Sequence, residues 1–116
     1  MNEHELQRTL IEAAQWYGFR VAHFRPARTE HGWRTPVEGD AGFVDLVLAH
    51  PSGPVFAWEL KAASGRLTND QQAWAEALGG GHVVPMRWNV IRPKTLDEAL
   101  EELWAVSDGR RRVRVP

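Results

Sequence analysis

Cysteine is absent from the sequence, so disulfide bonds, thiolate metal ligands and cysteine nucleophiles are excluded. Long apolar runs are absent as well, since none approaches the roughly 18 residues that a membrane-spanning helix needs. The start of the chain, residues 1–5, is polar and acidic and does not resemble a secretory signal. These absences predict a cytoplasmic protein with no membrane partner.

An excess of one charge is also missing, because 14 Lys and Arg nearly balance 15 Asp and Glu to give a net charge of −1. The overall charge therefore does not indicate a nucleic-acid partner. Lysine itself is scarce, and among the 14 cations only Lys61 and Lys94 are lysines. Seven of the twelve arginines gather in two stretches, which are Arg25, Arg28 and Arg34, and then Arg110, Arg111, Arg112 and Arg114.

The pattern of apolar residues predicts one small α/β domain, as the length of 116 residues and the apolar share of 43% also indicate. We expect helices over 3–17, 68–78 and 95–104, and strands over 19–24, 43–49, 55–61 and 82–91. This αβββαβα order indicates a mixed four-stranded sheet flanked by helices. Pro85 interrupts the last strand, so that strand should lie at or near an edge of the sheet.

Local signals refine this outline. Capping boxes are predicted at the helix starts by three pairs, Asn2 with Glu5, Thr68 with Gln71, and Thr95 with Glu98. Residues 25–42 lack periodicity, and so long a stretch in a small domain is usually functional or disordered. A domain of residues 1–105 should be followed by a basic tail, 106–116, which either binds phosphates or is an idle terminus. Five tryptophans fall in regular elements and are expected mostly in the core: Trp16, Trp58, Trp74, Trp88 and Trp104.

Two carboxylates face each other across the predicted hairpin of residues 43–61. A turn centred on Ser52 pairs residues equidistant from it, which sets Asp45 opposite Glu59. Side chains alternate along a strand, so Lys61 shares the face of Glu59. Carboxylates directly opposite each other repel, and a divalent cation between them would relieve the repulsion. Mg²⁺ suits such a place, because it prefers carboxylate and carbonyl oxygens and keeps several waters.

The motifs Gly42-Phe43-Val44-Asp45, Glu59-Leu60-Lys61 and Gly65-Arg66-Leu67-Thr68 resemble those of the PD-(D/E)XK nuclease superfamily. Within that superfamily the chain is similar to the VRR-NUC group, whose small domains are common in phage and bacterial genomes. Further residues fit the same group, namely Glu3, Leu6, Gln7, His23, Gln71, Trp74, Arg92 and Pro93. The resemblance covers residues 3–103 and implies a restriction-endonuclease-like α/β fold.

The resemblance also implies a metal-dependent DNA endonuclease. Asp45 and Glu59, together with the backbone carbonyl of Leu60, would bind Mg²⁺, for which Mn²⁺ would substitute, and no organic cofactor is implied. Such a metal lowers the pKa of a bound water and stabilises charge on the scissile phosphate. Lys61 would orient or deprotonate that water and counter the developing negative charge.

Two of the implied site positions keep alternative interpretations. Gln71 is either a site residue, as the resemblance implies, or only the partner of Thr68 in a capping box. Glu3 and Glu5 compete for the acidic position in the first helix. Glu3 is favoured, because it keeps the family spacing to Gln7 and because Glu5 has a capping role of its own.

DNA contacts are expected from His23, from Arg66 and from the loop 25–42. In that loop Arg25, Arg28 and Arg34 accompany Trp33, which is a plausible clamp of cations with one stacking ring. The alternatives are a structural histidine and a solvated, charged loop.

The resemblance further implies action on branched, flapped or four-way DNA by a homodimer, since a single small domain offers one active site. The alternative function is a non-catalytic DNA-binding module, or an accessory subunit, that keeps the nuclease fold. The intact set of Asp45, Glu59 and Lys61 favours the enzyme.

Overall fold

The computed structural model describes residues 1–24, 27–30, 32–34, 38–79 and 86–114, without the side chains of 27–29, 33–34 and 108–114. Its elements, in chain order, are α1 (Glu3–Trp16), β1 (Arg20–His23), β2 (Ala27–Thr29), β3 (Gly32–Arg34), β4 (Leu46–Ala49), β5 (Val55–Leu60), α2 (Asn69–Gly79), β6 (Met86–Ile91), the 3₁₀ helix η1 (Pro93–Thr95) and α3 (Leu96–Arg114).

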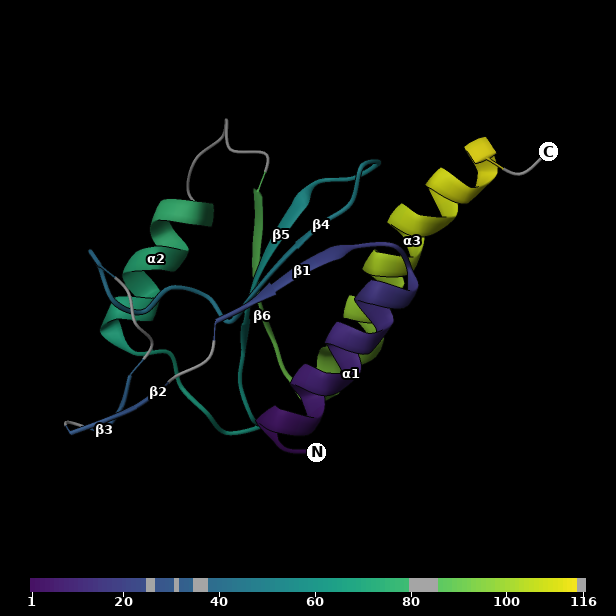
Figure 1. Cartoon of the computed structure of the whole chain (residues 1–116). Helices are drawn as coiled ribbons and strands as arrows, with labels where there is room; N and C mark the ends of the chain where they lie inside the picture. Colours follow the sequence, from purple (N-terminus) through teal and green to yellow (C-terminus); the bar gives the residue numbers. More distant parts are fainter. Residues whose placement is uncertain (25–26, 31, 35–37, 80–85, 115–116) are drawn as a thin grey trace.

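Four strands form the central mixed sheet, in the order β1-β4-β5-β6. Strand β4 runs antiparallel to both β1 and β5, whereas β6 runs parallel to β5, so α2 is the helix of the crossover between them. Helix α2 covers one face of the sheet, and α1 and α3 cover the other (Figure 1). The predicted fold class, the αβββαβα order of the elements around this sheet and the edge position of β6 are confirmed.

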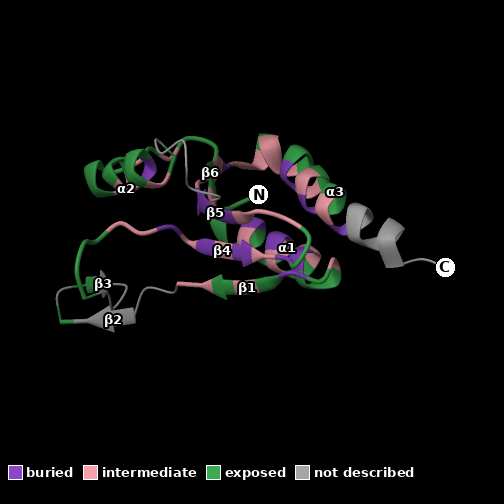
Figure 2. Ribbon diagram, turned by 90° about the horizontal axis from the view of Figure 1, so that it is seen from above, coloured by how far each residue is buried: buried purple, intermediate pink, exposed green. Residues whose placement is uncertain are grey.

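The main core lies between the sheet and the pair of helices α1 and α3. On this face β4 and β5 place side chains that are at most 2% exposed, and the buried positions of α1 pack against them (Figure 2). Burying one such large apolar side chain stabilises the fold by about 1.5–3 kcal/mol. The buried set from the three elements is Leu6, Leu10, Ala14, Leu46, Leu48, Phe56, Trp58 and Leu60.

The register of the β4–β5 hairpin is the one predicted from the turn around Ser52. Leu46 pairs with Trp58 and Val47 with Ala57, which are positions equidistant from that turn. Because side chains alternate across a sheet, this register sends Leu46 and Trp58 to the main core. The same alternation leaves Glu59 on the face that α2 covers.

Both ends of α1 follow the sequence signals. The Asn2 side chain accepts a hydrogen bond from the Glu5 N–H at 2.8 Å, and the Glu5 carboxylate accepts one from the Asn2 N–H at 3.4 Å. These two bonds are the predicted capping box. At the other end Gly18 has a φ of +89°, a conformation that glycine adopts without steric cost, and it turns the chain into β1.

Three regions differ from the expectations. The strand predicted from Phe43 begins only at Leu46, and the loop 25–42 contains the short hairpin β2–β3, although residues 25–26, 31 and 35–37 lie outside the described residues. Residues 82–85 of the predicted last strand also lie outside them. The third helix was expected to end at Trp104, but α3 continues to Arg114 through the segment interpreted as a tail.

Early residues of that segment belong to the packed domain. Val106 packs against the core, and a Cβ on Gly53 would stand 2.5 Å from its Cγ1. Two of the tryptophans expected in the core are instead exposed, Trp16 by 85% and Trp104 by 37%. No helix in the described part of the chain has the length and apolar composition to cross a bilayer.

Strand β6 is an edge strand whose outer side is partly occupied by one of its own side chains. The Lys61 N–H donates to Ile91 O, so Ile91 turns its backbone groups toward β5, and Val90 turns its own outward. The Asn89 side-chain oxygen accepts a hydrogen bond from this Val90 N–H at 2.8 Å. One outward donor of the edge is therefore bonded within the chain.

Candidate metal and nucleic-acid site

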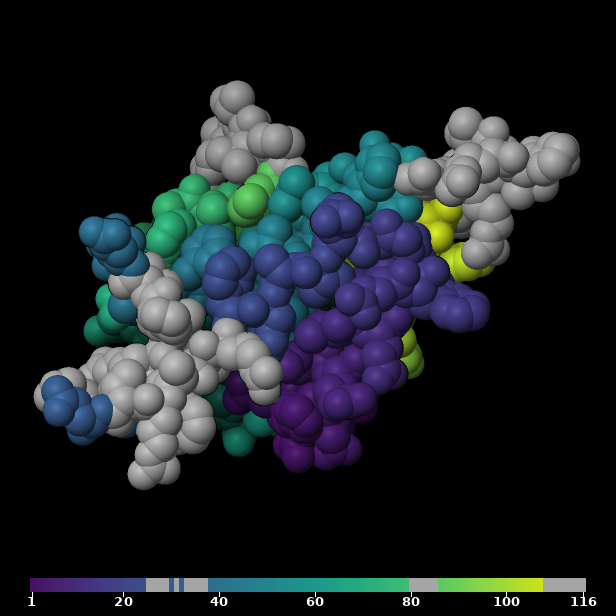
Figure 3. Space-filling view, in the orientation of Figure 1, coloured from purple at the N-terminus to yellow at the C-terminus, as the bar shows by residue number. Residues whose placement is uncertain are grey.

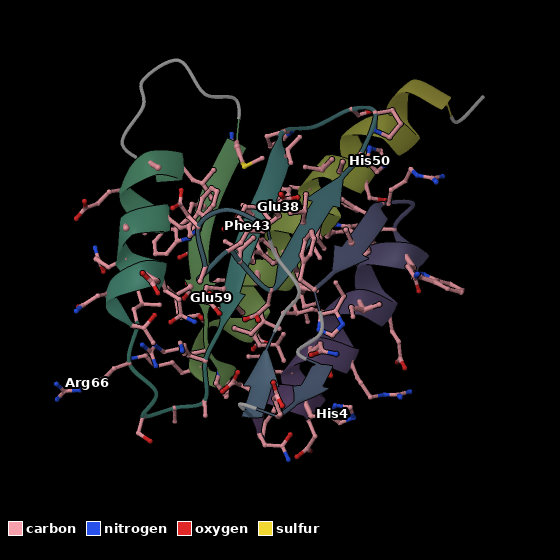
Figure 4. The ribbon with its side chains drawn as sticks, turned by 60° about the vertical axis from the view of Figure 1, so that its left-hand side comes forward. His4, Glu38, Phe43, His50, Glu59 and Arg66 are labelled. Atoms are coloured by element: carbon pink, nitrogen blue, oxygen red, sulfur yellow. The ribbon has the colours of Figure 1, made fainter. Side chains whose placement is uncertain are left out.

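The two carboxylates predicted to face each other lie together at one end of the hairpin. Asp45 directly precedes β4, and its Oδ2 accepts a hydrogen bond from the backbone N–H of Leu60 at 2.8 Å. Glu59 is 3% exposed, and its side chain is hydrogen-bonded to that of Asp45. In Figure 4 Glu59 lies on the sheet far from His50, which marks the opposite end of the strands.

The surroundings of Glu59 hold its carboxyl in the protonated form. Burial, followed by the hydrogen bond to Asp45 and the charge of Asp45, raises the pKa of Glu59 from 4.5 to about 9. Lys61 lowers that pKa, and Glu3 raises it further. Three groups named from the sequence, Asp45, Lys61 and Glu3, therefore act electrostatically on Glu59.

Lys61 follows β5 directly and is half-buried. Its backbone N–H donates to Ile91 O at 3.1 Å, which fixes the backbone from which the side chain starts. A Cβ built on Gly65 would lie 3.2 Å from Lys61 Cδ, so the turn after β5 runs along the stem of the lysine. Its ammonium lies near enough to Glu59 to lower the pKa of that carboxyl.

The two candidate glutamates of α1 differ in what they contact. Glu5 is exposed and belongs to the capping box with Asn2. Glu3 is exposed too, but its charge reaches Glu59 and raises the pKa of that carboxyl, an effect that Glu5 does not exert. This effect on Glu59 agrees with the choice of Glu3 for the acidic position of the first helix, which stays a prediction.

Gln71 takes part in the capping box predicted for α2. Its side-chain oxygen accepts a hydrogen bond from the Thr68 N–H at 2.9 Å, and Thr68 Oγ1 accepts one from the Gln71 N–H at 3.1 Å. The side chain is half-buried, and its amide nitrogen is not used by this box. A Cβ on Gly42 would lie 2.9 Å from Gln71 N, so the start of α2 touches the segment that leads to Asp45.

That segment, residues 40–43, is held by aromatic contacts with α2. Trp74 Nε1 donates to the carbonyls of Asp40 and Ala41 at 3.3 and 3.0 Å. The Phe43 ring packs edge-on against Trp74 with centroids 4.8 Å apart. The resemblance named Phe43 and Trp74 only as members of its motifs. In the structure they hold the segment 40–43 against α2.

Arg92 is a second residue whose contacts could not be read from the motif. Its Nη1 donates to Ala62 O at 2.9 Å and to Gly65 O at 2.7 Å. These carbonyls belong to the turn that directly follows Lys61. A basic residue directly after β6, beside the parallel strand β5, was the signal that could have suggested this contact.

The residues expected to touch DNA are described unequally. His23 ends β1, and its Nδ1 lies 3.4 Å from Gln7 Nε2. Arg66 is exposed on the loop before α2 and projects away from Glu59 (Figure 4). Arg25 lies outside the described residues, and Arg28 and Arg34 are in β2 and β3 with side chains that are not described.

A shallow groove runs along the contact of α1 with β1, two elements that lie side by side on the face in Figure 3. Its volume is about 290 Å³, and an exposed ion pair of Arg8 with Glu12, at 3.1 Å, forms part of its wall. The lining residues are His4, Gln7, Arg8, Ile11, Glu12 and His23.

A divalent metal fits the carboxyl pair by its donor set. Mg²⁺ is commonly held by one or two carboxylates and completes its shell with water and substrate phosphate. Asp45 and Glu59 supply two carboxylates, and the Leu60 carbonyl is the third protein oxygen that the resemblance implies. No group of three or more His, Asp or Glu gathers closely enough for a metal among the described residues.

By sequence, neither a family model nor a curated protein matches the chain. By structure, the chain is similar to a solved structure described as "VRR_NUC domain", with a TM-score of 0.63 and 20% sequence identity. The match covers 85% of this chain and 94% of that one. It confirms the resemblance to the VRR-NUC group at the level of the fold.

Proposed function

We propose that this chain, which has the fold of a VRR_NUC domain, is a divalent-metal-dependent DNA endonuclease. The observation that carries the proposal is the hydrogen-bonded carboxyl pair of half-buried Asp45 and buried Glu59 beside Lys61. A buried carboxylate beside a second carboxylate is costly unless a proton or a cation lies between them. A pair so close to a half-buried lysine has the composition of a catalytic metal site.

Each residue of the pair has a defined task in this proposal. The Leu60 N–H donates to Oδ2 of Asp45, which orients the carboxylate that would hold the metal. Glu59 and the Leu60 carbonyl would supply the other protein oxygens. When bound, the metal supplies an activated water and stabilises charge on the phosphate. Glu3 adds negative charge beside the pair, which favours a cation.

Lys61 would act on the reacting groups themselves. As an ammonium it would orient the attacking water and offset the negative charge that develops on the scissile phosphate, and as the neutral amine it would accept the proton of that water. The product would be a cleaved phosphodiester bond in DNA. Because Lys61 is not a metal ligand in this scheme, its loss should stop cleavage without stopping metal binding.

The substrate side of the proposal uses the surfaces around the pair. Arg66 and His23 would contact backbone phosphates, together with the arginines of the segment 25–34. Gln71 would assist through the amide nitrogen that its capping role leaves over. We extend the proposal to branched, flapped or four-way DNA and to a two-fold homodimer, because symmetric cleavage of a junction needs two active sites.

Cleavage assays with the purified chain test the function. Linear, nicked, flapped and four-way DNA should be cut in Mg²⁺ or Mn²⁺ and left intact in EDTA. The variant Lys61→Ala should lose cleavage, whereas Lys94→Ala, which removes the other lysine from an exposed position, should keep it. Equal cleavage by both variants would overturn the role of Lys61.

Binding measured beside cleavage separates the alternatives. A chain that binds DNA but never cuts it under these conditions is a binding module, and cleavage that appears only with a second protein identifies an accessory subunit. Sedimentation at micromolar concentration, with and without DNA, tests the homodimer. A species of only 13.1 kDa in both cases would remove it.

A further inference from the structure

The end of β6 clamps the segment that carries Lys61 at two consecutive points. Ile91 O accepts the N–H of Lys61 at 3.1 Å. The next residue, Arg92, donates from a single guanidinium nitrogen to the carbonyls of Ala62 and Gly65 at 2.9 and 2.7 Å. Both distances are typical of good N–H···O hydrogen bonds, and bonds from a charged donor are the stronger kind.

The backbone of Arg92 is itself fixed from the other side. Thr95 Oγ1 accepts the Arg92 N–H at 3.1 Å and donates to Arg92 O at 3.2 Å. The Thr95 N–H also donates to Arg92 O, at 3.0 Å. The guanidinium therefore extends from a rigid junction between β6 and η1, and it is half-buried.

The turn 62–65, held by Arg92, packs along the side chain of Lys61. Gly65 N–H donates to Ala62 O at 3.2 Å, which closes the turn, and Arg92 adds a second hydrogen bond to the same oxygen. A Cβ on Gly65 would stand 3.2 Å from Lys61 Cδ and 3.6 Å from its Cβ. Opening the turn would remove this packing and let the flexible stem of Lys61 explore further rotamers.

We infer that Arg92 is a positioning residue for Lys61, and that it acts by holding the turn 62–65 against the lysine stem. The inference adds to the proposed function a residue that contacts neither metal nor DNA. Both hydrogens of Arg92 Nη1 are used by the turn carbonyls. A bound phosphate would have to compete with them at that nitrogen.

The kinetic part of the test rests on the proposed nuclease activity. Arg92→Gln should lower kcat by about tenfold to a hundredfold, the usual cost of a misplaced catalytic group. The DNA dissociation constant, measured in EDTA, should be unchanged within error. Gly65→Ala should lower kcat as well while keeping the carbonyls that Arg92 binds. Arg87→Gln, which changes an exposed arginine on the preceding strand β6, is the matched control and should behave as wild type.

A structural readout keeps the inference testable even if the wild-type chain cuts no DNA. The chain has only two lysines, so reductive ¹³C-methylation gives two side-chain NMR signals besides that of the amino terminus, and Lys61→Ala identifies which one is Lys61. The Lys61 methyl groups should be ordered in the wild type and become as mobile as those of Lys94 in Arg92→Gln.

Either of two results would overturn the inference. One is a Lys61 signal that Arg92→Gln leaves unchanged. The other is weaker DNA binding with an unchanged kcat, because that would make Arg92 a DNA contact. If Arg92→Gln does not fold, the kinetic and NMR measurements are made on Gly65→Ala. An unaltered Lys61 signal in that variant would likewise overturn the inference.

Discussion

Glu59 is hydrogen-bonded to Asp45 just beyond the last paired residues of β4 and β5. The two side chains approach because Leu46 pairs with Trp58, which brings the neighbours of both residues together. Burial and this hydrogen bond raise the pKa of Glu59 to about 9, so at neutral pH Glu59 keeps its proton. Mutual repulsion, expected from the sequence for the metal-free protein, is therefore largely relieved by protonation.

The raised pKa predicts that the metal-free protein loses stability as the pH rises. Between 4.5 and about 9 the folded state keeps a proton on Glu59 that the unfolded state has released. The stabilising contribution is complete below pH 4.5 and is lost as the pH approaches 9. Thermal melting in EDTA across this range should show a decline in Tm that is reduced in Glu59→Gln. An equally steep decline in the variant would show that another group causes it.

Mn²⁺ or Mg²⁺ should raise the Tm, because a ligand that binds only the folded state stabilises it. At a concentration a hundredfold above the dissociation constant the gain is about 2.7 kcal/mol. The metal must displace the proton of Glu59, so the shift should grow with pH. Asp45→Asn and Glu59→Gln should lose the shift, and Lys61→Ala should keep it. Retention of the full shift by Asp45→Asn would mean that Asp45 serves only as the acceptor for the Leu60 N–H.

Glu3 and Glu5 should respond differently to the same change. Glu5→Gln weakens the capping box and should lower the free energy of unfolding by about 0.5–1 kcal/mol, with activity nearly unchanged. Glu3→Gln removes a charge that acts on Glu59 and should reduce cleavage strongly, with little effect on stability. Urea unfolding and cleavage rates of both variants provide the comparison. The opposite ordering would assign the acidic position of the first helix to Glu5.

Gly42 should tolerate no side chain, because a Cβ there would lie 2.6 Å from Asp70 Cβ and 2.7 Å from its carbonyl carbon. Gly39 is a matched control, since its φ is also positive but nothing lies within 4 Å of its Cβ position. Both alanine variants bear a backbone cost of about 1–2 kcal/mol. Gly42→Ala should lose roughly 1–3 kcal/mol more through crowding, together with cleavage. Equal unfolding free energies would show that the start of α2 yields to the added methyl group.

The sequence was most informative where one short-range rule decides the structure. A symmetric turn at Ser52 determined the hairpin register, and with it the meeting of Asp45 and Glu59. Capping boxes at Asn2 and Thr68 followed from spacing alone. The capping box predicted for Thr95 and Glu98 is wrong. The Thr95 hydroxyl is instead hydrogen-bonded to the backbone N–H and carbonyl of Arg92.

Two kinds of prediction failed. A tryptophan in a helix was assumed to be buried, and a run of charged residues was assumed to mark the end of a helix. Trp16 lies about 120° around α1 from Leu10, at 100° per residue, so the helical period itself directs it outward. The arginines after Gly109 were interpreted as a tail, yet arginine is a good helix former and suits the negative end of a helix. The contacts of Arg92 join residues about thirty positions apart, beyond what local patterns encode.

The hydrogen bond from Val90 N–H to Asn89 has a consequence for how copies of this molecule meet. An open edge strand is a template on which a second chain can add a strand, and such addition leads readily to aggregation. The Asn89 carboxamide occupies a donor that an incoming strand would need. Pairing of two sheets edge to edge along β6 is thereby disfavoured. The proposed homodimer is accordingly expected to associate through a surface other than the edge of β6.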